Sequence, residues 1–286
     1  MGLINAIKNI FQRNGGAEDV MTAPAPVPVM YPVESSKDSD ADPISDPTGW
    51  LLDSGLAEVI LMNTHEIKLM CMFGYALLNG YKLYPKLPAN CAASYRFISL
   101  ILANTGGGIL VPIFINAIPV SLSDTYPIVI IVAYLIHEFY PMIREVIGLS
   151  PVFKVLLICM YECNRAFVLV KLTKAASAAI APSEFDFAVF GPIFCGAIGG
   201  CGGAFLPLSK GLDPIKEGGL AQPMYSALIA ATCFHFFMHT SLSDGVIEPV
   251  KKAQLVIAVS FIIHNIYTTY FTGAAHGHVS AEKKKN

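Results

Sequence analysis

Seven apolar stretches follow one another between residues 50 and 272, and each has close to the ~20 residues that a helix needs to cross the hydrocarbon core of a bilayer. This pattern predicts an all-α integral membrane protein with seven transmembrane helices. We expect them near residues 55–78, 93–115, 126–147, 152–173, 187–208, 221–242 and 251–271.

Glycine clusters interrupt two of these stretches. The clusters are Gly106, Gly107 and Gly108 in the second stretch and Gly199, Gly202 and Gly203 in the fifth. Breaks in a membrane helix are tolerated only against protein or a watery cavity. The clusters therefore predict kinked spans that line a pore or act as hinges, with backbone carbonyls open to a cation. The alternative is close packing of helices, which small residues also permit.

The two halves of the chain resemble each other weakly at an offset of 96 positions, which relates Gly106 to Gly202 and Glu66 to Glu162. Each copy holds three spans, so the second copy must insert upside down relative to the first. Inverted repeats with interrupted helices often build a polar path through lipid, which favours transport over enzymatic chemistry. The predicted parts are an N-terminal tail (1–50), repeats at 51–150 and 151–245, a seventh span (246–272) and a C-terminal tail (273–286).

Charge is sparse and unevenly distributed. Only 14% of the residues are charged, against about 25% in soluble domains. The loops 116–126, 175–185 and 243–250 contain no lysine or arginine, whereas the opposite loops and the C-terminal tail are basic. Because basic loops usually face the cytosol, we expect a cytosolic C-terminus. The first 50 residues, rich in Pro, Ser and Asp, predict a mostly disordered acidic tail.

Charged residues are also predicted near the middle of two spans: Glu66 and Lys68 in the first, and Glu162 and Arg165 in the fourth. Each costs about 2.5–3.5 kcal/mol on insertion scales unless it is paired or wetted. Glu162 and Arg165 have the spacing to pair on one helix face. Otherwise these charges face a water-filled route, where they meet ions and lipid headgroups.

Three histidines are a weaker signal. His235 and His239 share one face of the sixth span, and His264 lies on the seventh. This spacing can hold a metal ion, but no carboxylate lies between the first two as in H-E-x-x-H. We therefore favour interhelical hydrogen bonds and expect no metal.

Four motifs in order resemble the trimeric intracellular cation channel family. They are the segment 93–110 with its Gly-Gly-Gly-Ile-Leu, the segment 161–167, the glycine-rich segment 196–206 and the Met-His-Thr at 238–240. The segment 161–167 is similar to the family's Lys-Glu-Val-x-Arg-x-Trp through Glu162, Arg165 and Phe167. The resemblance spans about residues 50–272.

This resemblance implies two inverted three-span repeats plus a last helix, in a homotrimer with one pore inside each protomer. It implies a monovalent cation channel, chiefly for potassium, in the endoplasmic or sarcoplasmic reticulum. There it would supply counter-ion current while calcium is released or refilled. Lys283 and Lys284 also resemble the dilysine signal of endoplasmic-reticulum proteins. Phosphatidylinositol bisphosphate is implied as a ligand near the lysine and arginine of the fourth-span motif.

The sequence departs from the family in that fourth-span motif. Tyr161 stands where the family usually has a lysine, and Val168 where a second lysine often follows. Arg165 remains, with Lys171 and Lys174 one to two turns further on. We therefore expect inositol-lipid binding to be shifted or weakened, and the passage of cations to be easier.

Three other functions fit parts of the pattern. A secondary transporter with alternating access also uses inverted repeats, and it would show saturable, coupled flux. A seven-span receptor shares the expected topology, although the repeat and the short outer loops argue against it. An intramembrane metalloenzyme would use the three histidines and would contain bound metal.

Overall fold

A computed structural model describes residues 46–123, 125–182, 184–201 and 219–272, and this part of the chain is built from helices without strands. The helices are α2 (Gly55–Leu61), α3 (His65–Leu83), α4 (Ala93–Phe114), α5 (Thr125–Phe139), α6 (Met142–Leu149), α7 (Pro151–Ala179), α8 (Phe190–Gly200), α10 (Gln222–His239) and α11 (Pro249–Tyr267). Short helical turns are η1 (Gly49–Leu51), η2 (Tyr84–Lys86), η3 (Val120–Leu122), η5 (Ser241–Ser243) and η6 (Thr268–Thr272). The all-α prediction is confirmed for the described residues.

Several of these helices are apolar enough to cross a membrane. By length and composition, two helices qualify alone, namely Ala93–Phe114 and Pro249–Phe271. A third span results if α5 and α6, which meet at 95°, are taken together. The protein is a multi-pass membrane protein, and the total of seven spans stays a prediction. Most of the predicted N-terminal tail (1–45) and the whole C-terminal tail (273–286) lie outside the described residues.

The predicted first span, 55–78, is two helices rather than one. Met62 ends α2 in the left-handed conformation, with φ of 54°. Thr64 then caps α3, and its hydroxyl accepts a hydrogen bond from the backbone N of Ile67 at 3.3 Å. The prediction that Glu66 lies within a continuous span is therefore wrong. Glu66 is exposed in the first turn of α3, where the helix dipole favours an acid.

The predicted third span, 126–147, is also broken. α5 ends at Phe139, and Pro141 precedes α6. The residue before a proline is disfavoured in the α conformation, so a helix tends to end there. Arg144 of α6 turns back and donates a hydrogen bond to the carbonyl of His137 in the last turn of α5. The guanidinium thus satisfies a backbone group that the helix end leaves without a helical partner.

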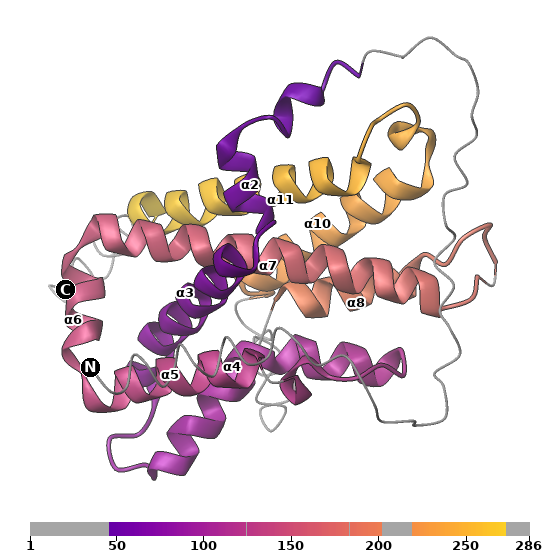
Figure 1. Cartoon of the computed structure of the whole chain (residues 1–286). Coiled ribbons are helices and arrows are strands. Elements are labelled where there is room, and N and C mark those ends of the chain that lie inside the picture. The colour runs from indigo at the N-terminus through magenta and orange to yellow at the C-terminus, as the bar shows by residue number, and fades with distance from the viewer. Residues whose placement is uncertain (1–45, 124, 183, 202–218, 273–286) are drawn as a thin grey trace, which may run out of the picture. The chain divides into compact units, whose positions relative to one another are not determined.

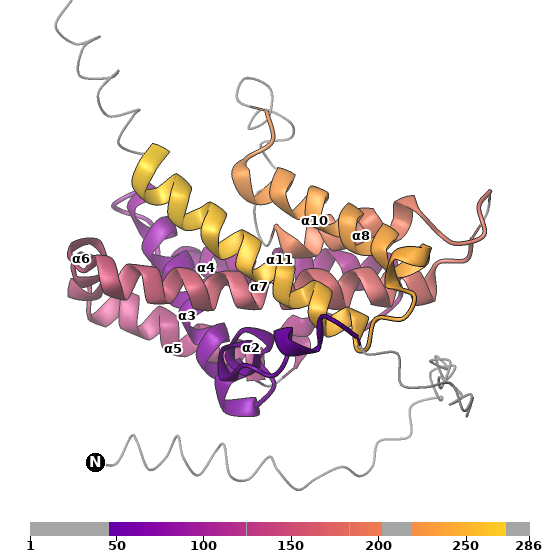
Figure 2. The same ribbon diagram turned by 90° about the horizontal axis from the view of Figure 1, so that it is seen from above.

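Equivalent helices of the two predicted repeats pack against each other. α3 packs on α7, α4 packs on α8, and α10 and α11 complete the bundle (Figure 1). Figure 2 shows α11 running obliquely across α7. In Figure 1, α6 and the start of α7 lie at one end of α7, whereas the α7–α8 and α10–α11 connections lie at the other. Among the described residues, the basic loops that follow α3 and α5 therefore lie at the opposite end from the lysine-free loops that follow α7 and α10.

A short segment before α2 is attached to the start of α11. The Asp46 carboxylate accepts a hydrogen bond from the backbone N of Ile247 at 2.8 Å and forms an ion pair with Lys252. Lys252 also donates to the Thr48 hydroxyl at 2.9 Å. The described chain consequently begins at the lysine-free end, beside the N-terminus of α11, and its last helical residues leave α11 at the other end.

Candidate functional site

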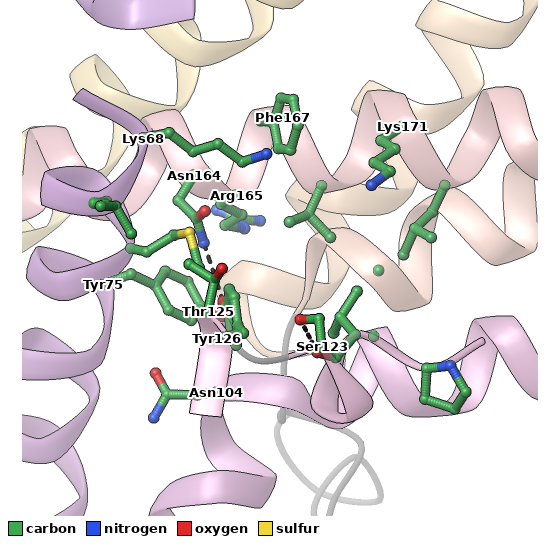
Figure 3. Close-up of a pocket in the computed structure, with 18 of the residues that line it drawn as sticks. Lys68, Tyr75, Asn104, Ser123, Thr125, Tyr126, Asn164, Arg165, Phe167 and Lys171 are labelled. Carbon is green, nitrogen blue, oxygen red and sulfur yellow. Dashed lines mark hydrogen bonds between the residues drawn. The ribbon is translucent and has the colours of Figure 1, made fainter. Parts of the chain in front are cut away.

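A cavity of about 560 Å3 opens between α3, α4, α5, α7 and α8 (Figure 3). Its wall combines aliphatic side chains with polar ones from all of these helices except α8. The polar and charged residues of the wall are His65, Lys68, Tyr75, Asn104, Ser123, Thr125, Tyr126, Asn164, Arg165 and Lys171. Such a mixed lining can hold water and small ions.

The charges of the cavity wall are positive. Lys68 reaches from α3 to the ring of Phe167, with its Nζ 5.0 Å from the ring centroid, and Lys171 projects from α7 (Figure 3). No carboxylate is among the described residues that line the cavity. Lys174 and Glu66 are exposed and lie outside the lining. The part of the wall that the structure describes is therefore electropositive.

Amide and phenol groups close the bottom of the cavity. Asn164 donates a hydrogen bond to the Tyr126 hydroxyl at 3.4 Å, drawn as a dashed line in Figure 3. Asn79 donates to the side-chain oxygen of Asn104 at 3.0 Å. Asn104 in turn donates to the carbonyl of Leu100 at 2.7 Å. These bonds join α3 to α4 and α5 to α7.

Arg165 reaches the cavity wall, but all three nitrogens of its guanidinium group have hydrogen-bond partners within the protein. Its guanidinium pairs with Glu162 at 2.9 Å and donates to the carbonyl of Gly200 at the end of α8. It also donates to the carbonyl of Pro223 at 2.7 Å and to the hydroxyl of Ser226 at 2.6 Å, both in α10. The pairing that the i, i+3 spacing predicts is thus present.

Glu162 is equally enclosed. It is fully buried, and its second oxygen accepts a hydrogen bond from Asn265 of α11 at 2.5 Å. The Phe261 ring, also on α11, lies 4.1 Å from the Arg165 guanidinium carbon. The Glu162–Arg165 pair therefore links α7 to α8, α10 and α11. Its geometry is that of a structural connection rather than of a charge facing an ion.

The glycine clusters bring two helix backbones into contact. A Cβ built on Gly107 would lie 2.4 Å from the carbonyl oxygen of Ile198 and 2.9 Å from the Cα of Gly199. α4 continues through Gly106, Gly107 and Gly108, all buried, but changes direction near its middle in Figure 1. α8 ends at Gly200. Close packing is thus observed for the described glycines; Gly202 and Gly203 lie outside the described residues, and a pore role stays a prediction.

Tyr161 occupies the position at which the sequence departs from the family. Its ring is buried and stacks on Tyr75, with centroids 4.6 Å apart and planes 12° from parallel. The Nζ of Lys82, from the end of α3, lies 4.5 Å from the Tyr161 ring centroid. A lysine thus remains beside this position, but it comes from α3 instead of α7.

Two of the three histidines form the predicted interhelical hydrogen bonds, and the third bonds to the segment before α8. His239 bonds to the hydroxyl of Ser177 on α7 at 3.1 Å, and His264 bonds to the Tyr225 hydroxyl on α10 at 2.8 Å. His235 bonds to the carbonyl of Ala188 at 2.7 Å. Within the described residues, no three His, Cys, Asp or Glu side chains gather as a metal site.

Several residues of the site were missed from the sequence. Asn104, Asn164 and Asn265 lie within predicted spans, where a buried amide needs a partner, and that placement could have identified them. Lys82 and Tyr75 carry no such signal. Their importance follows only from the position of α3 against α7.

Comparisons with known proteins support the fold. No protein-family model and no curated protein matches the sequence. A solved structure of a trimeric intracellular cation channel from C. elegans, determined in the absence of Ca2+, is similar with a TM-score of 0.55 at 17% identity. The match covers 70% of this chain and 89% of that chain. Fold and site define an α-helical multi-pass membrane protein. Its fold is that of the C. elegans trimeric intracellular cation channel.

Proposed function

We propose that this protein is a cation channel of intracellular membranes, chiefly permeable to potassium. It would work as a homotrimer in the endoplasmic or sarcoplasmic reticulum, with a cytosolic C-terminus, and supply counter-ion current during calcium release and uptake. The observation that carries this proposal is the fold shared with a trimeric intracellular cation channel. The motifs around Gly106–Gly108 and Glu162–Arg165 support it from the sequence.

The arrangement of the described helices suits a route through each protomer. The cavity lies against the crossing of α4 and α8, where Gly108 and Gly199 contribute to its wall. The lysine-free loops carry Glu184, Asp244 and Glu248 at one end of the bundle. Acidic residues around a mouth raise the local concentration of cations. A cation would therefore be attracted to this end before it meets the lysines of the cavity.

The electropositive cavity favours one alternative, an anion channel. Lys68 and Lys171 line the cavity, and no described carboxylate offsets them there. In a potassium chloride gradient the two functions have opposite reversal potentials. The test is purified full-length protein in a planar bilayer with asymmetric potassium chloride. Unitary currents that reverse near the potassium equilibrium potential support the proposal. Unitary currents that reverse near the chloride equilibrium potential indicate an anion channel instead. Saturable flux without unitary currents indicates a transporter.

We also propose that any inositol-lipid headgroup is held by Lys68 and Lys171 rather than by Arg165. The guanidinium of Arg165 already has Glu162 and backbone carbonyls as partners, so it has little capacity left for phosphate. Vesicles containing phosphatidylinositol bisphosphate should bind the wild type and Lys174→Gln alike, and bind Lys171→Gln more weakly. Equal binding by all three proteins would contradict this assignment.

A further inference from the structure

Three residues of α3 lie on one line. Lys68, Tyr75 and Lys82 are spaced by seven positions, which is close to two helical turns, so they share one side of the helix and rise about 10 Å per step. Lys68 and Tyr75 line the cavity, whereas Lys82 does not and is exposed beyond it. The line runs from the cavity toward the basic end of the bundle.

The middle of this line is blocked by two tyrosine rings. Tyr75 and Tyr161 are 4% and 8% exposed, and their rings stack at 4.6 Å. Because Tyr75 covers one face of the Tyr161 ring, the Lys82 Nζ, 4.5 Å from the same centroid, must lie over the other face. Tyr161 thus separates the cavity from a lysine that is open to the opposite side.

Hydrogen bonds of asparagine side chains connect the helices near the two rings. The Asn79–Asn104 hydrogen bond lies one helical turn beyond Tyr75 on α3 and ties α3 to α4. The Asn164–Tyr126 bond ties α7 to α5 at the cavity floor. Together with the Tyr75–Tyr161 stack between α3 and α7, these two bonds connect α3, α4, α5 and α7.

We infer that the stacked pair Tyr75–Tyr161 is the closed gate between the cavity and the basic end. Lys82 places a positive charge next to this gate, on the side of the basic end. This inference rests on the proposed function, because a gate needs a permeant ion. Opening requires the rings to separate, which moves α3 against α7. Tyr161, which stands where the similar family motif has a lysine, would then be a residue that closes the route.

The first test is potassium current through Tyr161→Ala and Tyr75→Ala. Removing either ring should raise the open probability by roughly three- to tenfold, the range expected for the loss of one aromatic stack. Tyr161→Phe keeps the ring and should behave as the wild type. Phe153→Ala, a large-to-small change on α7 outside the cavity lining, is the matched control. Wild-type open probability in both alanine variants, with wild-type currents present, would overturn the gate but not the proposed function.

A second test does not need ion conduction. Lys68→Cys places a thiol in the cavity, in a chain whose more accessible cysteines Cys91, Cys159 and Cys233 are replaced by serine. A charged, membrane-impermeant thiol reagent is added at the basic end of reconstituted protein. Labelling should be slow when Tyr161 is present and at least several times faster with Tyr161→Ala. Equal labelling rates would overturn the gate, whereas a rate difference without any potassium current would retain it and reject the proposed function.

Discussion

At the scale of single residues, Arg165 provides a hydrogen-bond donor for a backbone carbonyl at the end of α8. The last carbonyls of a helix have no partner within the helix, and in a membrane protein they cannot rely on water. Arg165 supplies donors to the Gly200 carbonyl and to Pro223 at the start of α10. Its charge is balanced by Glu162, which is itself bonded to Asn265. The pair therefore allows α8 to end inside the bundle.

We predict that Arg165→Leu destabilises the protein by about 3–5 kcal/mol, because it leaves Glu162 buried without its partner. Thermal unfolding in detergent should show a markedly lower Tm. Lys174→Leu removes an exposed lysine from the same helix and should leave the Tm nearly unchanged. The double variant with Glu162→Leu should be less destabilised than the sum of the two single variants, and strict additivity would contradict the coupling.

Lys171 tests the charge of the cavity. Replacing it by glutamine removes one positive charge from the wall. We expect potassium conductance to rise about two- to threefold, the effect of a unit charge some 7 Å away in a water-like medium. Single-channel recording provides the measurement. Lys174→Gln, three residues further on and outside the lining, should conduct as the wild type; an equal rise in both variants would point to a general surface effect.

Asp46 makes the attachment of residues 46–48 dependent on pH. Hydrogen bonds from Lys252, Thr48 and the backbone of Ile247 lower the pKa of the Asp46 carboxyl well below its ordinary value. A lowered pKa stabilises the folded state above the ordinary value of about 3.9, and this contribution is lost as the pH falls toward the lowered pKa. We expect a constant Tm difference between wild type and Asp46→Asn from pH 5 to 8, which shrinks below about pH 4. Asp53→Asn, an exposed neighbour, should show no such trend.

At the scale of elements, the crossing of α4 and α8 depends on Gly107. A side chain there would meet the backbone of Ile198 and Gly199, which cannot move aside as a flexible side chain can. We predict that Gly107→Leu forces the helices apart, costs about 1–3 kcal/mol and abolishes current while membrane insertion persists. Gly55→Leu, where a Cβ meets nothing within 4 Å, should be tolerated. Wild-type currents from Gly107→Leu would refute a role of this crossing in conduction.

The sequence predicts helices well where the apolar pattern alone determines them. The expected spans 93–115 and 152–173 correspond to Ala93–Phe114 and Pro151–Ala179. It fails at Met62, because a left-handed residue without glycine gives no signal in the sequence. The turn between α5 and α6 does have a signal in Pro141, but the apolar pattern of residues 126–147 favours one continuous span.

The candidate site was predictable only within single helices. The spacing of Glu162 and Arg165 indicates their pairing. Their other partners, Gly200 and Asn265, are 35 and 103 positions away from them. No helical periodicity relates residues so far apart. For the same reason the stack of Tyr75 on Tyr161, which depends on how α3 packs on α7, could not be anticipated.

At the scale of the whole bundle, the predicted inverted repeats account for two contacts between equivalent helices, α3 with α7 and α4 with α8. α4 runs toward the lysine-free end and α8 begins there, so the two glycine-rich helices cross with opposite directions. α3 and α7 are opposed in the same way. Both pairs of equivalent helices, α3 with α7 and α4 with α8, therefore pack in opposite directions beside the cavity. In the first repeat, an ion pair joins Arg96 of α4 to Glu138 of α5. In the second repeat, the Glu162–Arg165 pair connects α7 to α8, α10 and α11.

The path of the chain also determines on which sides of the membrane its ends lie. Asp46 is bound at the N-terminal end of α11, and α11 carries the chain to the opposite end of the bundle. With the two ends of the bundle on opposite sides of the membrane, we expect an odd number of crossings between residue 46 and residue 272, in agreement with the predicted seven spans. We predict that an epitope tag placed before residue 46 and one placed after residue 272 face opposite sides of the membrane.

Protease protection of sealed vesicles measures this directly. The tag after residue 272 should be cut from the cytosolic side, because basic loops face the cytosol, while the tag before residue 46 should be protected. A tag in the lysine-free loop at 243–246 serves as the control and should be protected together with the N-terminal tag. Cleavage of both terminal tags from one side would mean an even number of crossings. The two repeats could then not be inverted relative to each other with a seventh span after them, and the route proposed between them would lose its basis.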